Sequence, residues 1–116
     1  MENVILTRSL EFAVRVVKLY KFLIEDKSEY VMSKQLLRSG TSIGANVREG
    51  AYAESKKDFV SKMSIALKEA SETKYWLELL KRTEYITENQ YESMNEDSNE
   101  IIKILTAIVK SARKSV

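Results

Sequence analysis

Two glycines one helical turn apart, Gly40 and Gly44, constrain the fold of this chain more than any other feature. They lie on the apolar face of a segment whose apolar residues recur at 3.6-residue spacing, which predicts a helix. The other members of that face are Leu36, Ile43, Val47 and Ala51. Each glycine inside a helix costs about 1 kcal/mol relative to alanine. We therefore expect tertiary packing to hold this helix, with a second backbone lying close against Gly40 and Gly44.

A polar stripe runs beside that apolar face and consists of Ser39, Ser42, Asn46, Glu49 and Ala53. Asn46 can donate and accept hydrogen bonds, whereas Glu49 can accept them. Two interpretations stay open for this pair. The favoured one is hydrogen bonding across helices, which would fix their register, and the other is binding of a partner's backbone.

Composition predicts an all-α chain of one domain, residues 1–116. The sequence has no proline and no cysteine, and no segment shows sustained strand alternation. No basic-then-apolar leader precedes Leu10, and apolar runs stay far below the roughly 20 residues that span a bilayer. We expect a soluble, cytoplasmic protein without a membrane partner.

Four helices are expected, joined by short turns into an antiparallel up-down bundle. Ser33 is expected to cap the second, and the pairs Ser55–Asp58 and Thr87–Gln90 to cap the third and fourth. The expected ranges are about 7–25, 34–53, 56–82 and 88 onward. The first helix is expected to bury Leu10, Ala13, Val16, Val17, Leu19, Tyr20, Leu23 and Ile24.

The absence of histidine and cysteine removes the commonest acid-base residue, the thiol nucleophile and the usual zinc ligands. Residues 40–50 also lack the Gly-Lys-Ser/Thr end of a phosphate loop. Glu49, Glu69 and Glu72 are more readily explained as surface charges than as ligands of a hard cation. We expect a non-enzymatic protein with no cofactor and no metal.

Residues 41–50, Thr-Ser-Ile-Gly-Ala-Asn-Val-Arg-Glu-Gly, resemble the Ser-Ile-x-x-Asn-Ile-x-Glu-Gly signature of a bacterial family. Its members are four-helix bundles encoded by intervening sequences in large ribosomal RNA genes. The matching positions are Ser42, Ile43, Asn46, Glu49 and Gly50, with Val47 in place of isoleucine and Arg48 in place of alanine. Residues 57–59, 65–73 and 75–77 resemble that family's third helix, so the resemblance spans nearly the whole chain.

The resemblance implies a ring-shaped homo-oligomer, specifically a pentamer. Apolar residues outside the main core stripes give candidates for its subunit interface: Val14, Phe22, Ile65, Trp76 and Leu79. The alternative is that these residues merely flank the core of their own subunit. The position of Trp76, well off the main stripe, favours the interface.

The family's genetic setting implies association with RNA or DNA, as do similar bundle proteins that assist reverse transcription in diversity-generating retroelements. Candidate phosphate contacts are Arg8, Arg15, Lys18, Lys21, Arg38, Arg48, Lys56 and Lys57. For each basic residue taken singly, a solvated helix face is favoured instead, with Glu11 pairing with Arg8 and Arg15. The net charge of +2 is only weakly basic.

Two function classes therefore stay open. The first is an oligomeric RNA-associated or other nucleic-acid-associated accessory protein. The alternative is a scaffold that binds another protein and has no nucleic-acid role. An enzyme ranks third, because no spacing in the chain predicts a catalytic cluster.

Overall fold

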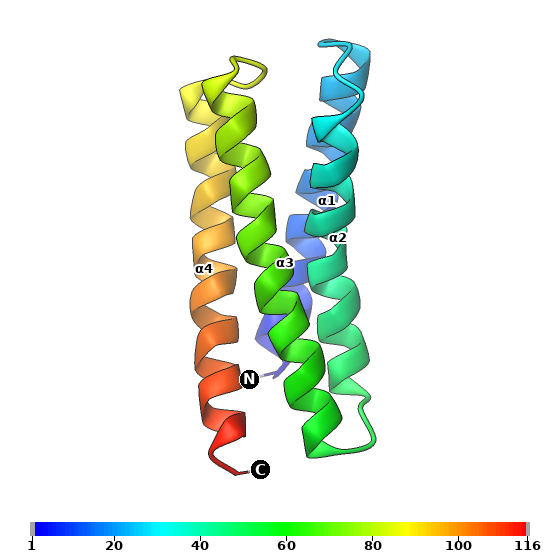
Figure 1. Ribbon diagram of the computed structural model, residues 1–116, viewed down its shortest axis with the longest axis vertical. Coiled ribbons are helices and arrows are strands. Elements are labelled where there is room, and N and C mark those ends of the chain that lie inside the picture. The colour runs from blue at the N-terminus through cyan, green and yellow to red at the C-terminus, as the bar shows by residue number, and fades with distance from the viewer. Residues whose placement is uncertain (1, 116) are drawn as a thin grey trace.

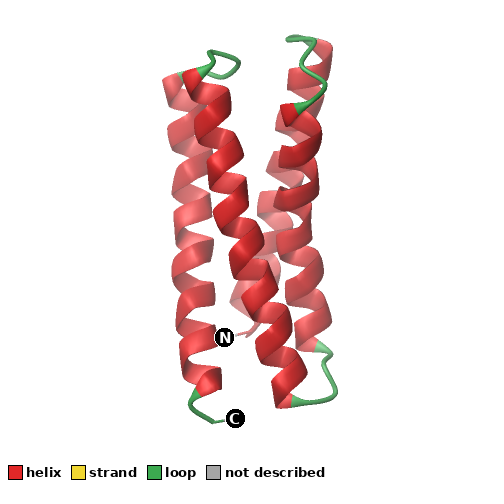
Figure 2. Ribbon diagram, in the orientation of Figure 1, coloured by secondary structure: helices red, strands yellow, loops and turns green. Residues whose placement is uncertain are grey.

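The computed structural model describes residues 2–115, and these form four α-helices and no strand. The helices are α1 (Glu2–Glu25), α2 (Met32–Ala51), α3 (Lys56–Arg82) and α4 (Glu88–Arg113) (Figure 1). The molecule is elongated, measuring 46 × 20 × 19 Å. The α1–α2 and α3–α4 connections lie at one end, and the α2–α3 connection lies at the other (Figure 2). The predicted all-α, four-helix chain is confirmed.

Buried positions on every helix advance in alternating steps of three and four residues, the spacing of a coiled-coil seam. On α1 and α2 they are Ile5, Ser9, Phe12, Val16, Leu19 and Leu23, then Ser33, Leu36, Gly40, Ile43, Val47 and Gly50. On α3 and α4 they are Met63, Ala66, Ala70, Thr73, Leu77 and Leu80, then Met94, Ser98, Ile101, Leu105 and Ile108. The core is therefore one continuous stack along the bundle axis, containing several small polar residues.

The expected core face of α1 is wrong in part. Leu10 is 53% exposed, whereas Phe12, which the expected stripe omits, is fully buried. These residues lie about 200° apart around the helix. Because apolar residues cover most of this helix, periodicity alone did not fix which side meets the core. The helix also begins at Glu2, several residues before the expected start.

Two of the three expected caps are confirmed. Ser55 Oγ accepts the Asp58 N–H at 3.0 Å, and Thr87 and Gln90 form a reciprocal capping box. The prediction for Ser33 is wrong, because α2 already begins at Met32 and the Ser33 hydroxyl donates to the Glu29 carbonyl at 2.7 Å.

The buried carboxylate of Glu29 supplies the missing cap of α2. It accepts the N–H groups of Val31, Met32 and Ser33 at 3.1, 3.0 and 2.7 Å. Three of the four free N–H groups expected at a helix start thereby find a partner.

The backbone of α2 lies close to α1 at Gly40 and Gly44. A Cβ atom at Gly40 would lie 2.7 Å from Val16 Cγ2, and one at Gly44 would lie 3.3 Å from the Ser9 carbonyl oxygen. Gly50 meets α3 instead, where its Cβ would lie 3.0 Å from Met63 Cε. The first two glycines therefore let α1 and α2 approach, and the third admits α3.

Candidate functional site

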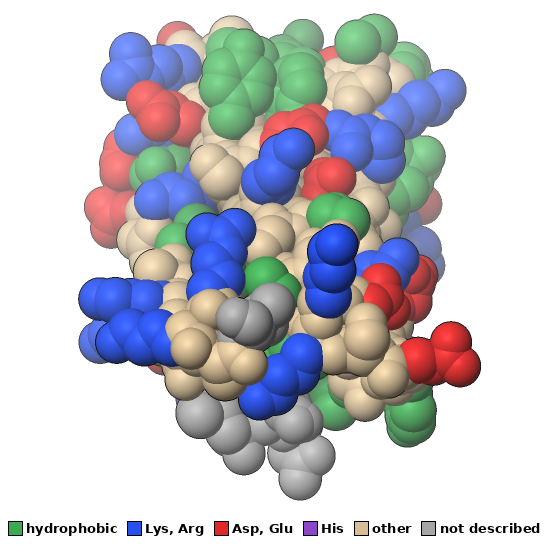
Figure 3. Space-filling model, turned by 60° about the horizontal axis from the view of Figure 1, so that its bottom comes forward, with side chains coloured by type: hydrophobic (Ala, Val, Ile, Leu, Met, Phe, Trp, Pro, Cys, Tyr) green, Lys and Arg blue, Asp and Glu red, His purple; other side chains and the backbone are tan. Residues whose placement is uncertain are grey.

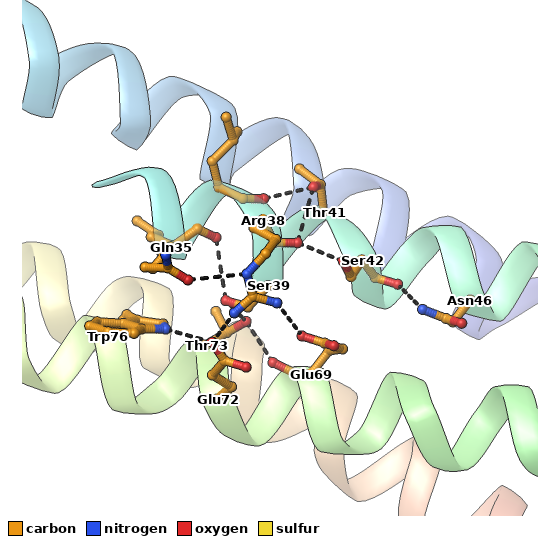
Figure 4. A network of polar contacts seen from close by, with 12 residues as sticks. Gln35, Arg38, Ser39, Thr41, Ser42, Asn46, Glu69, Glu72, Thr73 and Trp76 are labelled. Atoms are coloured by element: carbon orange, nitrogen blue, oxygen red, sulfur yellow. Dashed lines mark hydrogen bonds and ion pairs between the residues drawn. The ribbon is translucent and has the colours of Figure 1, made fainter. Parts of the chain in front are cut away.

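The family motif lies on α2 and divides between core and surface. Ile43 and Gly50 are buried. Ser42 Oγ donates to the Arg38 carbonyl at 2.7 Å, and Asn46 Nδ2 donates to the Ser42 carbonyl at 2.9 Å (Figure 4). Glu49 forms an ion pair with Lys62 of α3 at 3.0 Å. Of the two polar residues weighed above, Glu49 links helices, whereas the Asn46 amide binds within its own helix.

A polar network joins α2 to α3 near the middle of the bundle (Figure 4). Arg38 forms ion pairs with Glu69, at 3.3 Å, and with Glu72. Glu72 also accepts the indole N–H of Trp76 at 2.9 Å. Arg38 and both carboxylates are therefore already engaged within the molecule, rather than directed at an RNA phosphate or a cation.

Beneath Arg38, a buried hydrogen bond of 2.9 Å joins the hydroxyls of Ser39 and Thr73. Thr73 Oγ1 also lies 2.8 Å from the Glu69 carbonyl oxygen. This pair is a buried polar contact between α2 and α3.

The basic residues of α1 are partly neutralised by acids of α4. Arg15 binds Asp97 at 2.6 Å and Ser93 Oγ at 2.7 Å, and Arg8 pairs with Glu100. The expected pairing of Arg8 and Arg15 with Glu11 is wrong, because α4 presents carboxylates along the facing side. In the part of the chain that the structure describes, Lys18 and Lys21 form no ion pair and are exposed.

An open groove of about 600 Å³ lies between α1 and α4 near Lys18. Its lining combines polar and apolar side chains, namely Arg15, Lys18, Leu19, Phe22, Asn89, Gln90, Ser93 and Met94. The ion pair of Arg15 with Asp97 bridges the two helices at this groove, and that of Arg8 with Glu100 bridges them further along the seam.

Basic side chains gather where α2 ends, α3 begins and α4 ends (Figure 3). We call this surface the basic end and define it by seven residues: Arg48, Lys56, Lys57, Lys62, Lys110, Arg113 and Lys114. Three acids, Glu49, Glu54 and Asp58, accompany them. Lys56 Nζ lies 3.0 Å from Ser115 Oγ, which ties the start of α3 to the segment after α4.

Lys62 is the member of the basic end that forms an ion pair, as far as residues 2–115 show. The hydrogen bond and charge of Glu49 raise the pKa of Lys62, and Asp58 adds a smaller effect in the same direction. Among the residues that the structure describes, the other six basic residues form no ion pair.

The sequence predicted Arg48, Lys56 and Lys57 as phosphate contacts, but it did not predict Lys110, Arg113 and Lys114. Recognising the second group needs helix lengths and chain directions that place the end of α4 beside the start of α3. The helix lengths and directions are known only from the assembled bundle, because no local sequence motif specifies them.

The five candidate interface residues do not form one patch. Val14 is 48% exposed on α1 and Ile65 is 37% exposed on α3. Phe22, Trp76 and Leu79 are partly buried, and the first two pack against the core. Because α1 packs against α2 and α4 but not against α3, the candidates lie on two different surfaces.

Among the side chains of residues 4–115, no three acidic groups lie close enough together to hold a metal ion. None of the helices in this part of the chain is both long and apolar enough to cross a membrane.

The bundle and the motif on α2 define a small, all-α helical protein. The chain belongs to the 23S rRNA-intervening sequence protein family, whose model matches residues 1–107. This confirms the resemblance inferred from the motif. Among curated proteins there is no match.

A similar solved structure is that of a protein of unknown function from the S23 ribosomal protein family of Bacteroides thetaiotaomicron. The two sequences are 65% identical, and the match covers 94% of this chain and 97% of that one, with a TM-score of 0.93. The four-helix fold is thus shared with a closely related bacterial protein.

Proposed function

We propose that this protein is a non-enzymatic, cytoplasmic binding protein that associates with RNA through its basic end. The family description, which refers to intervening sequences of 23S rRNA, supports an RNA partner. The basic end supplies the charge that binding a phosphate backbone requires. On α1 and α2, by contrast, Arg8, Arg15 and Arg38 are occupied by carboxylates.

The position of Lys56 and Lys57 is the observation that carries this proposal. They open α3, where the helix dipole is positive and disfavours cations. Lys110 and Arg113 lie in the last turn of α4, where the dipole stabilises them. The helix dipole therefore explains why basic residues occur at the end of α4, but it does not explain Lys56 and Lys57 at the start of α3. Binding of a polyanion would explain both groups.

RNA affinity measured as a function of salt tests the proposal. Each lysine that neutralises a phosphate steepens the fall of affinity with salt by close to one unit of logarithmic slope. We expect the double variant Lys56→Gln/Lys57→Gln to weaken binding of a labelled RNA and to reduce that slope by about 1–2 units.

The matched control is Lys18→Gln/Lys21→Gln, which removes the same charge from exposed positions of α1. It is expected to leave affinity and slope nearly unchanged. An equal loss in both variants would indicate attraction by net charge alone. RNA binding that ignores salt, or no binding at all, would contradict the proposal.

We further propose that the antiparallel up-down bundle assembles into a ring, a pentamer as the family resemblance implies. Closed rings need two different complementary surfaces on each subunit. The separate apolar positions on α1 and α3 support such an arrangement.

The alternative function is a scaffold that binds another protein. Leu10 and Val14, which are exposed on α1, suit such a contact equally well. This function is favoured if the protein forms an oligomer that does not bind RNA.

A further inference from the structure

Tyr52, at the basic end, is 81% exposed, the highest value among the large hydrophobic side chains that the structure describes. It follows directly after α2 and opens the connection to α3. A ring this exposed makes little contact within its own molecule, so nearly all of it is available to a ligand.

The backbone around Tyr52 is held in place. Its N–H donates to the Glu49 carbonyl at 3.3 Å, and the Ala53 N–H donates to the Gly50 carbonyl at 3.1 Å. Gly50 is itself buried against Met63 and Lys62 of α3. The ring is therefore presented from a fixed turn, which lowers the ordering cost of binding.

Basic side chains lie on both sides of Tyr52 along the chain, with the acids Glu49 and Glu54 between them. Arg48 is exposed one turn earlier, on the same face of α2, and Lys56 and Lys57 are exposed where α3 starts. Exposed aromatic rings among basic side chains are characteristic of surfaces that bind single-stranded nucleic acid.

We infer that the basic end binds unpaired nucleotides, with Tyr52 stacking on a base while Arg48, Lys56 and Lys57 contact the adjacent phosphates. This inference rests on the RNA association proposed above and names its ligand class. Bases inside a duplex already stack on one another, so an aromatic side chain gains affinity only where bases are unstacked.

Tyr30 offers a matched comparison. It is 56% exposed, but it lies in the α1–α2 connection at the opposite end of the bundle (Figure 1). Its charged neighbours in sequence are Asp26, Lys27, Glu29 and Lys34, two of each sign, so it lacks the excess of basic residues found at the basic end. Removing the Tyr30 ring therefore controls for the loss of an exposed tyrosine.

The test compares a single-stranded RNA oligomer with a blunt-ended RNA duplex by fluorescence anisotropy. We expect Tyr52→Ala to weaken binding of the single strand at least about fivefold and to leave duplex binding nearly unchanged. Tyr52→Phe, which keeps the ring, and Tyr30→Ala should both bind like the parent protein. In Tyr52→Trp, the added indole emission should be quenched by the single strand beyond any change of Trp76 in the parent.

The outcomes separate the two proposals. If Tyr52→Ala binds both RNAs like the parent while Lys56→Gln/Lys57→Gln weakens both, stacking is overturned and the RNA association stands. An equal loss of affinity for the single strand and the duplex in Tyr52→Ala also overturns it. If the parent binds neither RNA, both proposals fail. A change of oligomer mass in Tyr52→Ala would assign the ring to a protein contact instead.

Discussion

At the scale of single residues, Gly40 sets how closely α1 approaches α2. Alanine there gains up to about 1 kcal/mol of helix propensity, but its Cβ would lie 2.7 and 2.8 Å from the two Cγ atoms of Val16. Overpacking a filled core costs about 1–3 kcal/mol, so the clash outweighs the gain. We expect Gly40→Ala to lower the free energy of unfolding in urea, and Gly44→Ala to lower it less.

A double-mutant cycle identifies the cause. In a Val16→Ala background the methyl carbons are absent, so Gly40→Ala should then cost less than it does in the parent protein. Equal costs in both backgrounds would show that Val16 is not the residue that requires glycine at this position.

Glu29 gives a second residue-scale prediction. Its buried carboxylate accepts three N–H groups at the start of α2. Glu29→Ala leaves these groups without their acceptor and is expected to cost about 1–2 kcal/mol in the free energy of unfolding. Glu29→Gln, which keeps one acceptor oxygen, should cost less. Equal stability of the alanine variant and the parent in urea would exclude the cap.

Local chemistry explains which of these residues the sequence predicted. Ser55 and Thr87 were predicted as caps because Asp58 and Gln90 follow them at a spacing of three residues, a pattern that can be read along the chain. In the structure, each hydroxyl accepts the backbone N–H three residues later. Glu29 was missed because it caps from before the helix, in a connection where Ser28 adopts a positive φ of 52°. Nothing in the residue types specifies that turn.

At the scale of whole helices, pairing decides which buried hydroxyls stabilise the bundle. Thr73 binds Ser39 across the α2–α3 interface, whereas Ser98 Oγ on α4 has no hydrogen-bond partner among the described residues. Thr73→Val removes the partner of Ser39 on α3, leaves Ser39 only its 3.5 Å hydrogen bond to the Leu36 carbonyl, and should cost about 1–3 kcal/mol. Ser98→Ala should be neutral or stabilising. Thermal unfolding of both variants tests this, and a larger loss for Ser98→Ala would contradict the assignment.

The ion pair between Glu49 of α2 and Lys62 of α3 predicts a dependence on pH. Because the pKa of Lys62 is raised above its ordinary 10.5, the pair stabilises the folded state fully below that pH. The contribution is lost as pH rises through the folded pKa. The stability difference between the parent and Glu49→Gln should therefore shrink above about pH 10.5. Parallel unfolding curves from pH 7 to 11 would contradict it.

Helix existence was predictable, because propensity and spacing act within each helix. The side of α1 that faces the core was not predictable, because Leu10, Val14 and Val17 form a second apolar stripe on this helix. Only the positions of the neighbouring helices decide which of the two stripes is buried. The partners of Arg8 and Arg15 were missed for the same reason. Asp97 and Glu100 lie more than eighty residues away and become neighbours through the bundle alone.

At the scale of the whole molecule, the bundle leaves apolar positions on two faces. Val14 on α1 and Ile65 on α3 are both partly exposed, although α1 and α3 are not neighbouring helices in the bundle. Within one subunit, the Val14 face and the Ile65 face cannot contact each other. The Val14 face of one subunit can, however, contact the Ile65 face of the next in a head-to-tail arrangement. Repeating that contact closes a ring when the rotation between subunits allows it.

Charge placed on either face should therefore block assembly. We expect Val14→Glu and Ile65→Glu each to reduce the mass measured by light scattering, because a carboxylate buried at an interface without a partner is strongly unfavourable. Val31→Glu, which places the same charge on a more exposed residue beside α2, is the control and should keep the parent mass.

Mixing Val14→Glu with Ile65→Glu tests whether the contact is head-to-tail. Each retains one intact face, so a heterologous contact predicts that the mixture recovers a dimer but no ring. If each contact instead joined identical faces, every variant would retain one intact self-contact and form dimers without mixing, and the head-to-tail ring would be excluded.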